Sequence, residues 1–140
     1  MRIDTSQAYS VVITSCKELF EKKTKDYGTA WRILRLSSIT DQIFIKAQRI
    51  RSIQEKGQQK IEDDIKSEFI GIINYCLIAM IQIDLNEVIE MELSWEELAP
   101  RYDQAVNETK KLLQDKNHDY DEAWRDMRVS SMTDIILMKL

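Results

Sequence analysis

The stretch KDYGTAWRILRLSSITD at residues 25–41 decides the architecture, because it returns as HDYDEAWRDMRVSSMTD at residues 118–134. With the sequence shifted by 93 positions, residues 17–46 show 15 identities in 30 without a gap, where chance gives about two. The shared residues are charged and aromatic, so this is not low complexity. We therefore predict an internal duplication: residues 1–93 form a first unit, residues 94–140 form a second, incomplete unit, and the two pack as one domain.

The composition of the 140-residue chain favours helices. It contains only three glycines and one proline, whereas all-β folds usually contain more of both in their turns. Hydrophobic residues make up 44% and charged residues 31%, which is the balance of a globular domain with its own core. We predict an all-α fold, a helical bundle of duplicated helix–loop–helix units, with no β-sheet.

Local signals place the helix starts. Three capping-box patterns, each a serine followed three residues later by an acid, are expected to open the second, fourth and fifth helices. They are Ser38 with Asp41, Ser94 with Glu97, and Ser131 with Asp134. Thr5 or Ser6 is expected to cap the first helix, and Pro100 fits the first turn of the fourth.

The helix ends follow from glycines and from the apolar periodicity. We expect the first helix to end near Lys23, Gly28 to break the chain before a short helix at residues 30–36, and Gly57 to end the second helix. The third helix is expected to cover about residues 60–92, and the fourth to end near residue 116.

The apolar run Phe69–Leu85 is about as long as a minimal membrane span. It contains Gly71, Asn74, Gln82 and Asp84, and true spans of that length rarely carry so many polar groups. We therefore predict a buried central helix in a protein that does not enter a membrane, with residues 69–83 the most buried part of the chain.

Charge and cysteine usage narrow the functional classes. A net charge of −4 and a pI near 5.1 disfavour nucleic-acid binding that depends on overall charge. The start of the chain lacks the apolar segment of a signal peptide, so we expect a cytoplasmic protein. Cys16 and Cys76 are interpreted as two buried free thiols, and His118 alone cannot build a histidine metal site.

The second unit stops at Leu140, inside a pattern that the first unit continues for about another ten residues. We infer a truncated form of a longer chain; the alternative is a half-repeat that evolved as such. In either case we expect Ile136, Leu137 and Leu140 to stay exposed and to drive homo-oligomerisation.

Three groups of residues could carry chemistry. The first is the repeated connection, where a cation, a carboxylate and two aromatic rings could stack a base and hold a phosphate. Its members are Lys25, Asp26, Tyr27, Trp31 and Arg32, with Asp119, Tyr120, Trp124 and Arg125 in the second copy beside His118. The alternative is structural: Asp26 caps a turn, and the aromatic rings close the end of the bundle.

The second group lies on the second helix and comprises Asp41, Lys46 and Arg49, with Lys139 as the copy of Lys46. Lys46 and Arg49 are three residues apart and share a face, and such cations suit a triphosphate. The alternative is a solvated helix face with ordinary surface ion pairs.

The third group lies on the third helix. Asp64 and Glu68 are four residues apart on one face, as two carboxylates that share a divalent cation must be. Asn74 interrupts the apolar run, so it should be buried and hydrogen-bonded. The alternative is that Glu62, Asp63 and Asp64 are simply an acidic first helical turn, favoured by the helix dipole.

The strings KDYGTAWR, SSITDQIFIKAQRIRSIQEKG and SEFIGIINYCLIAMIQ resemble the DUF1599 family, also called nucleotide modification associated domain 1. Members of that family are similar to the all-α nucleotide pyrophosphohydrolases of the MazG and dimeric dUTPase type. The resemblance covers about residues 7–90 and 100–140. It implies a MazG-like helical bundle that assembles in pairs, binds a nucleoside triphosphate, and holds Mg²⁺ on acids of two helices.

One position departs from the pattern that the resemblance implies. The related enzymes carry an acid three residues before the Asn–Tyr pair, and this chain has Gly71 there. The carboxylates nearest to it in sequence are Glu68 and Asp64, and the second helix offers only Asp41, so the first unit could bind a nucleotide with an incomplete metal site.

Two functions follow from these patterns. The first is Mg²⁺-dependent hydrolysis of a nucleoside or deoxynucleoside triphosphate to the monophosphate and pyrophosphate. Lys25, Lys46 and Arg49 would hold the phosphates, and Tyr27 or Trp31 would face the base. The second is a non-catalytic nucleotide-binding or assembly module. We expect either site where the DYG loop and the starts of the second and third helices converge.

Overall fold

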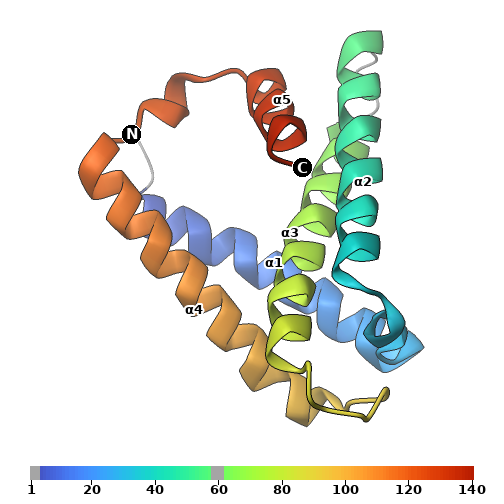
Figure 1. The fold of residues 1–140 in the computed structure, drawn as a ribbon. Helices are drawn as coiled ribbons and strands as arrows, with labels where there is room; N and C mark the ends of the chain where they lie inside the picture. The colour runs from blue at the N-terminus through green and yellow to red at the C-terminus, as the bar shows by residue number, and fades with distance from the viewer. Residues whose placement is uncertain (1–3, 58–61) are drawn as a thin grey trace.

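The computed structural model describes residues 4–57 and 62–140, and within them the chain is helical (Figure 1). The elements in chain order are α1 (Thr5–Tyr27), η1 (Ala30–Ile33), α2 (Leu36–Lys56), α3 (Glu62–Asp84), α4 (Trp95–Tyr120), η3 (Ala123–Asp126) and α5 (Val129–Lys139). The two η elements are short 3₁₀ turns. No strand occurs in these ranges, which confirms the all-α prediction.

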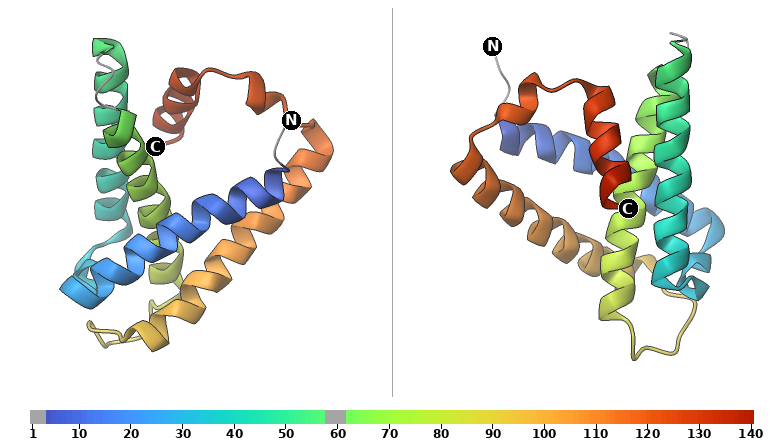
Figure 2. Two further views of the ribbon diagram at one scale, coloured as in Figure 1. Left: turned by 180° about the vertical axis from the view of Figure 1, so that it is seen from behind. Right: turned by 45° about the horizontal axis from the view of Figure 1, so that its top comes forward.

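Helix α3 lies at the centre of the bundle. Helix α2 runs beside it in all views, and α1 and α4 also contact it (Figures 1 and 2). The segment Phe69–Ile83 contributes Ile72, Leu77, Ile78 and Ile81 to the core, as predicted for a central helix. By length and composition alone, the described part Ile65–Asp84 is sufficient to cross a membrane. In this structure it packs against three other helices.

Helices α1 and α4, the η3 turn and α5 are arranged around a gap beside α3 (Figures 1 and 2). Part of this gap is an apolar cavity of about 580 Å³ between α1, α3 and α4, bordered by Trp124. Cys76 lies on its wall and is exposed, so the prediction that both thiols are buried is wrong for Cys76 and confirmed for Cys16.

Two of the predicted capping boxes do not form. Helix α2 starts at Leu36 with Arg35 as N-cap, and α5 starts at Val129 with Arg128 as N-cap, in both cases without a side-chain cap. The reason is that the chain leaves each 3₁₀ turn extended and is helical again two residues before the expected serine. Ser38 and Ser131 therefore lie within the first turn of a helix.

The third capping box forms as predicted. The Ser94 hydroxyl accepts from the Glu97 amide at 3.2 Å, and the Glu97 carboxylate accepts from the Ser94 amide at 3.0 Å. Because this box fixes the start of α4 at Trp95, Pro100 falls beyond the first turn and lies inside the helix, contrary to prediction. Gly57 ends α2 in the left-handed conformation with a φ of 64°, as predicted.

The remaining helix boundaries differ from the predictions. Asp4, and not Thr5 or Ser6, caps α1, because its carboxylate accepts from the Ser6 amide. Helices α1 and α4 run about one turn further than predicted, to Tyr27 and Tyr120. Helix α3 ends at Asp84 rather than near residue 92, because residues 85–93 form a connection whose carbonyl groups accept hydrogen bonds from the first repeated turn.

Helix α5 packs against α2, which changes the predicted exposure of its apolar side chains. Ile136 and Leu137 are half-buried against the core, so their predicted exposure is wrong. Leu140 is 42% exposed, as predicted.

Candidate functional site

A cavity of about 510 Å³ opens between α1, η1, α2 and α3, which is within the range of small-molecule sites. It borders the DYG loop, as expected for the candidate site, but it lies against the middle of α2 and α3, at Lys46 and Gly71, and not at the starts of these helices. The polar and aromatic side chains that line it are Phe20, Lys23, Thr24, Tyr27, Trp31, Gln42, Lys46, Asn74 and Tyr75, with Gly28 and Gly71 on the wall. Of the predicted ligands, it therefore contains Tyr27, Trp31, Lys46 and Asn74.

The turn after α1 is fixed by the connection that follows α3. Gly28 has a φ of 71°, and a Cβ atom there would lie 2.5 Å from the Glu92 carboxylate. Thr29 donates its amide to the same carboxylate at 3.2 Å and its hydroxyl to the Met91 carbonyl at 2.6 Å. These contacts hold Tyr27 and Trp31 on either side of the turn, at the wall of the cavity.

Arg32 was predicted to bind phosphate, but its guanidinium group is buried in the structure and does not line the cavity. It donates to the carbonyl groups of Val88, at 2.7 Å, and Glu90, at 3.2 Å, and to the Gln82 amide oxygen. Gln82 in turn donates to the carbonyl groups of Arg32 and Leu34. Arg32 is therefore a structural residue that joins the first turn to the end of α3.

Lys46 and Arg49 point from α2 toward α3, as the convergence of the site requires. The Lys46 ammonium lies 3.5 Å from one Glu68 carboxylate oxygen, and the Arg49 Nε lies 3.5 Å from the other. The Lys46 ammonium also lies 5.9 Å from the centre of the Tyr75 ring. Lys46 lines the cavity, whereas Arg49 lies outside it.

Asn74 is buried and hydrogen-bonded, as predicted for a polar residue in an apolar run. Its amide nitrogen donates to the Cys16 carbonyl at 3.1 Å, and its amide oxygen accepts from the Tyr102 hydroxyl at 2.9 Å. Burial raises the pKa of the Tyr102 phenol, so this donor keeps its proton. Asn74 thus joins three helices, and both ends of its amide are occupied by protein partners.

Two loop residues predicted as ligands lie outside the cavity. Lys25 is exposed and pairs with Glu21 at 3.8 Å, and Asp26 is exposed. Sequence reasoning missed Lys23, Thr24 and Gln42, and it gave no ligand role to Tyr75, the second member of the Asn–Tyr pair. Helical spacing could have identified three of them, because each lies one turn from a residue already singled out: Lys23 from Tyr27, Gln42 from Lys46, and Tyr75 from Gly71.

Two of the three predicted metal ligands, Asp41 and Glu68, have side chains that the structure describes. Asp41 is exposed on α2 and does not line the cavity, and Glu68 lies between two cations. The side chain of Asp64 lies outside those that the structure describes. No group of three histidine, cysteine, aspartate or glutamate residues suitable for a metal occurs among the described residues.

The second copy repeats the backbone of the first but has different surroundings. Asp121, at the position of Gly28, has a φ of 54° and a ψ of −157°, against 71° and −155° for Gly28, and a 3₁₀ turn follows each. Trp31 packs near Phe20, with ring centres 6.4 Å apart. Trp124 lies on the apolar cavity and donates to Asn117 at 3.2 Å.

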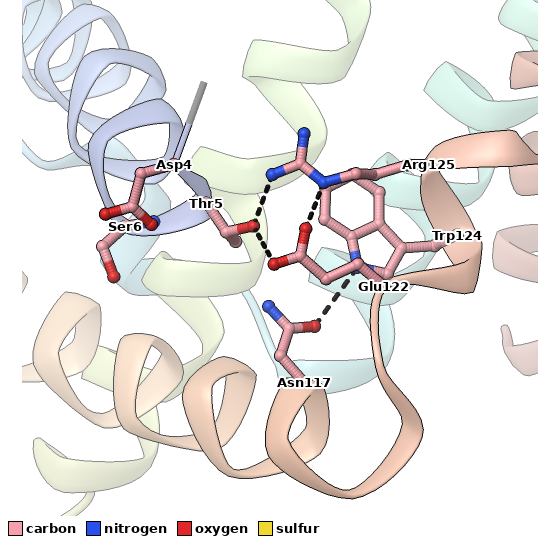
Figure 3. A network of polar contacts seen from close by, with 7 residues as sticks. All are labelled: Asp4, Thr5, Ser6, Asn117, Glu122, Trp124 and Arg125. Carbon is pink, nitrogen blue, oxygen red and sulfur yellow. Dashed lines mark hydrogen bonds and ion pairs between the residues drawn. The ribbon is translucent and has the colours of Figure 1, made fainter. Parts of the chain in front are cut away.

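Polar contacts attach the second copy to the start of α1 (Figure 3). Arg125 donates to the Thr5 hydroxyl at 2.7 Å and pairs with Glu122, and the Thr5 hydroxyl donates to Glu122 at 2.8 Å. The duplication predicts equivalent environments for Trp31 and Trp124, and this expectation is wrong, because different elements pack against each copy. Asp119 and Lys139 are exposed, and the Tyr120 side chain lies outside the described ones.

Most residues that line the cavity lie in a part of the chain that matches a known protein family. A sequence model described as nucleotide modification associated domain 1 matches residues 23–83 and 116–140, and so matches both copies of the repeated turn. No curated protein and no solved structure matches the chain. All residues that line the cavity, except Leu19 and Phe20, lie within the first matched segment.

Proposed function

This chain belongs to the nucleotide modification associated domain 1 family, and we propose that it binds a nucleotide in the cavity between α1, η1, α2 and α3. The observation that carries this proposal is the composition of the wall. Two aromatic side chains of the first repeated turn and two lysines of neighbouring helices meet there, and no carboxylate lines it in the described part of the chain.

Tyr27 and Trp31 are the residues that we assign to the base. Aromatic side chains stack on nucleobases with about 1–3 kcal/mol per base. The indole nitrogen of Trp31 is closed to solvent and has no hydrogen-bond partner among the described residues. The cavity is therefore lined by the carbon atoms of that ring, which suits stacking. Tyr27 is 77% exposed, so its ring is free to close over a bound base.

Lys46 and Lys23 are the residues that we assign to the phosphate. Both line the cavity from neighbouring helices, and the Lys46 side chain is only 28% exposed. A charge-assisted contact in such a partly desolvated place is stronger than one on an open surface. Thr24 and Gln42 add neutral polar groups to the same wall.

Binding is the function that the geometry supports best. Hydrolysis of a nucleoside triphosphate with Mg²⁺ is the reaction that the family resemblance suggests, and it needs carboxylates that the described side chains do not gather. We therefore propose a nucleotide-binding protein first, and treat hydrolysis as a second candidate that the same experiment tests.

The experiment is isothermal titration of the chain with a panel of ribonucleotides and deoxyribonucleotides. Lys46→Ala should weaken binding by about tenfold to a hundredfold, the value of a lost charged hydrogen bond of roughly 1.5–3 kcal/mol. Lys25→Ala is the matched control, because Lys25 lies in the last turn of α1, close to the cavity but outside it. Absence of binding by the parent chain, or equal loss in both variants, would contradict the proposal. Release of pyrophosphate with Mg²⁺ would support hydrolysis.

A further inference from the structure

Gly71 brings the Lys46 side chain unusually close to the backbone of α3. An ideal Cβ atom at Gly71 would lie 2.9 Å from both Cδ and Cε of Lys46 and 3.1 Å from its ammonium nitrogen. Real Cβ atoms essentially never lie closer than 3.0 Å to a heavy atom, so Cδ and Cε of Lys46 would have to move. Gly71 lies within α3 and is not among the glycines with positive φ, so the helix itself does not require glycine there. A side chain at position 71 would displace the flexible end of Lys46, so glycine is the residue that allows this close approach.

The Lys46 ammonium group is held on a strip of α3 that has Gly71 in its middle. Glu68 lies one turn before Gly71 and pairs with the ammonium at 3.5 Å. Tyr75 lies one turn after Gly71, and its ring centre is 5.9 Å from the same nitrogen. Residues spaced by three and four along a helix share one face. This face therefore fixes a positive charge on the wall of the cavity.

The residues near this charge do not fit a divalent cation. Mg²⁺ is bound through carboxylates and phosphate oxygens. The Glu68 carboxylate already has Lys46 on one oxygen and Arg49 on the other, which would repel a metal ion. Asp64 lies seven residues before Gly71 on the same helix, which is about 10 Å along the axis. In the described part of the cavity wall the charged groups are Lys23 and Lys46.

We propose that this cavity binds a nucleoside monophosphate without a divalent metal ion. Lys46 neutralises the phosphate charge, as Mg²⁺ does in metal-dependent sites, and Gly71 is the residue that positions Lys46. The proposal rests on the proposed function and narrows its ligand. A phosphate monoester carries about −1.5 to −2 charges at pH 7, which the two lysines of the wall can balance. A triphosphate would bring more negative charge than this wall neutralises.

The first experiment is titration of the unmodified chain with nucleoside monophosphates and triphosphates, each in EDTA and in MgCl₂. We expect a monophosphate to bind equally well, within about twofold, in both buffers, and more tightly than its triphosphate in EDTA. Binding that requires Mg²⁺, or a clear preference for the triphosphate in EDTA, would overturn the inference and leave the proposed function standing. No binding of any nucleotide in either buffer would overturn the proposed function itself.

The second experiment separates the positioning role of Gly71 from a structural one. Gly71→Ala should weaken binding by about tenfold, because the new methyl group displaces the Lys46 side chain. It should not lower the melting temperature, because alanine is the better helix former and Lys46 is flexible enough to move. A lower melting temperature with unchanged affinity would show a packing role and overturn the assignment.

Combining Gly71→Ala with Lys46→Ala tests whether Gly71 affects nucleotide binding through Lys46. If Gly71 acts through Lys46, the double variant should bind no more weakly than Lys46→Ala alone. Additive losses would show that Gly71 acts on the ligand by another route, and would overturn its role as a positioning residue.

Discussion

Replacing Tyr102 with phenylalanine tests the buried contact that joins α4 to α3. The Tyr102 side chain is fully buried, stacks on Phe20 with ring centres 5.0 Å apart, and donates its hydroxyl to Asn74 at 2.9 Å. Tyr102→Phe keeps the ring and its packing and removes only the hydroxyl group. The Asn74 amide oxygen is then left in the core without this donor.

The expected loss in the free energy of unfolding follows from the unpaired Asn74 oxygen. A buried polar group that loses its partner costs about 1–3 kcal/mol. For a chain of this length the melting temperature falls by roughly 3–4 °C per kcal/mol. Urea unfolding at pH 8 should therefore give a lower free energy of unfolding for Tyr102→Phe with an unchanged m-value. A variant as stable as the parent at pH 8 would show that the hydrogen bond does not form in solution.

The pH dependence provides an independent check on the same residue. Burial raises the pKa of the Tyr102 phenol above its ordinary value near 10. Its contribution to stability is thus complete below pH 10 and is lost as the pH rises above 10 toward the folded-state pKa. The parent should lose about 1.4 kcal/mol per pH unit in that range from this group, a loss that Tyr102→Phe avoids. If the parent exceeds Tyr102→Phe in stability by as much at pH 11 as at pH 8, the pKa of Tyr102 is not raised in the folded state and the reasoning is refuted.

The structure also predicts the behaviour of the thiols, of Gly28 and of the exposed apolar surface. Cys76 should react with a water-soluble thiol reagent in the native state and Cys16 only on unfolding, because Cys76 is exposed and Cys16 is fully buried; mass spectrometry would detect the reverse order. Gly28→Ala should lower the free energy of unfolding by about 1–3 kcal/mol, because its φ is 71° and Glu92 occupies the space of a side chain; unchanged urea unfolding would contradict this. We expect self-association through the apolar cavity beside α3, and a monomer in sedimentation at micromolar concentration would argue against it.

The sequence alone was sufficient for the fold class and for part of the site. Helical periodicity placed Lys46 and Arg49 on one face of α2, and both do contact Glu68 of α3. A polar residue in an apolar helix must have a partner in the core, and Asn74 has two. These predictions hold because they depend on spacing within a single helix and on the cost of an unpaired buried group.

The predictions that failed depend on the path of the chain between helices. Arg32 looked like a phosphate ligand because it lies in a connection that combines cations, a carboxylate and two aromatic rings. In the fold, residues 85–93 turn back and cover it with the Val88 and Glu90 carbonyl groups. Ser38 looked like a cap because the extended residues before α2 could not be located from the sequence. Long-range contacts of loops are not encoded in helical periodicity, so such side chains were assigned by their type alone.

The comparison of the two copies leads to a last prediction, at Asp121. The backbone of Asp121 matches that of Gly28 to within about 20° in φ and ψ, in a region that is essentially restricted to glycine and costs other residues of order 1–3 kcal/mol.

Asp121 is exposed, so its side chain gives up little packing when it is removed. Asp121→Gly should therefore stabilise the protein by roughly 0.5–2 kcal/mol, after the larger entropy of glycine in the unfolded chain is deducted. The measurement is urea unfolding of this variant beside Gly28→Ala, which should shift stability in the opposite direction. Nucleotide affinity should not change, since Asp121 lies outside the cavity between α1 and α3. Equal or lower stability of Asp121→Gly would show that this residue does not hold the glycine-like conformation, and that the two turns share their sequence without sharing their backbone.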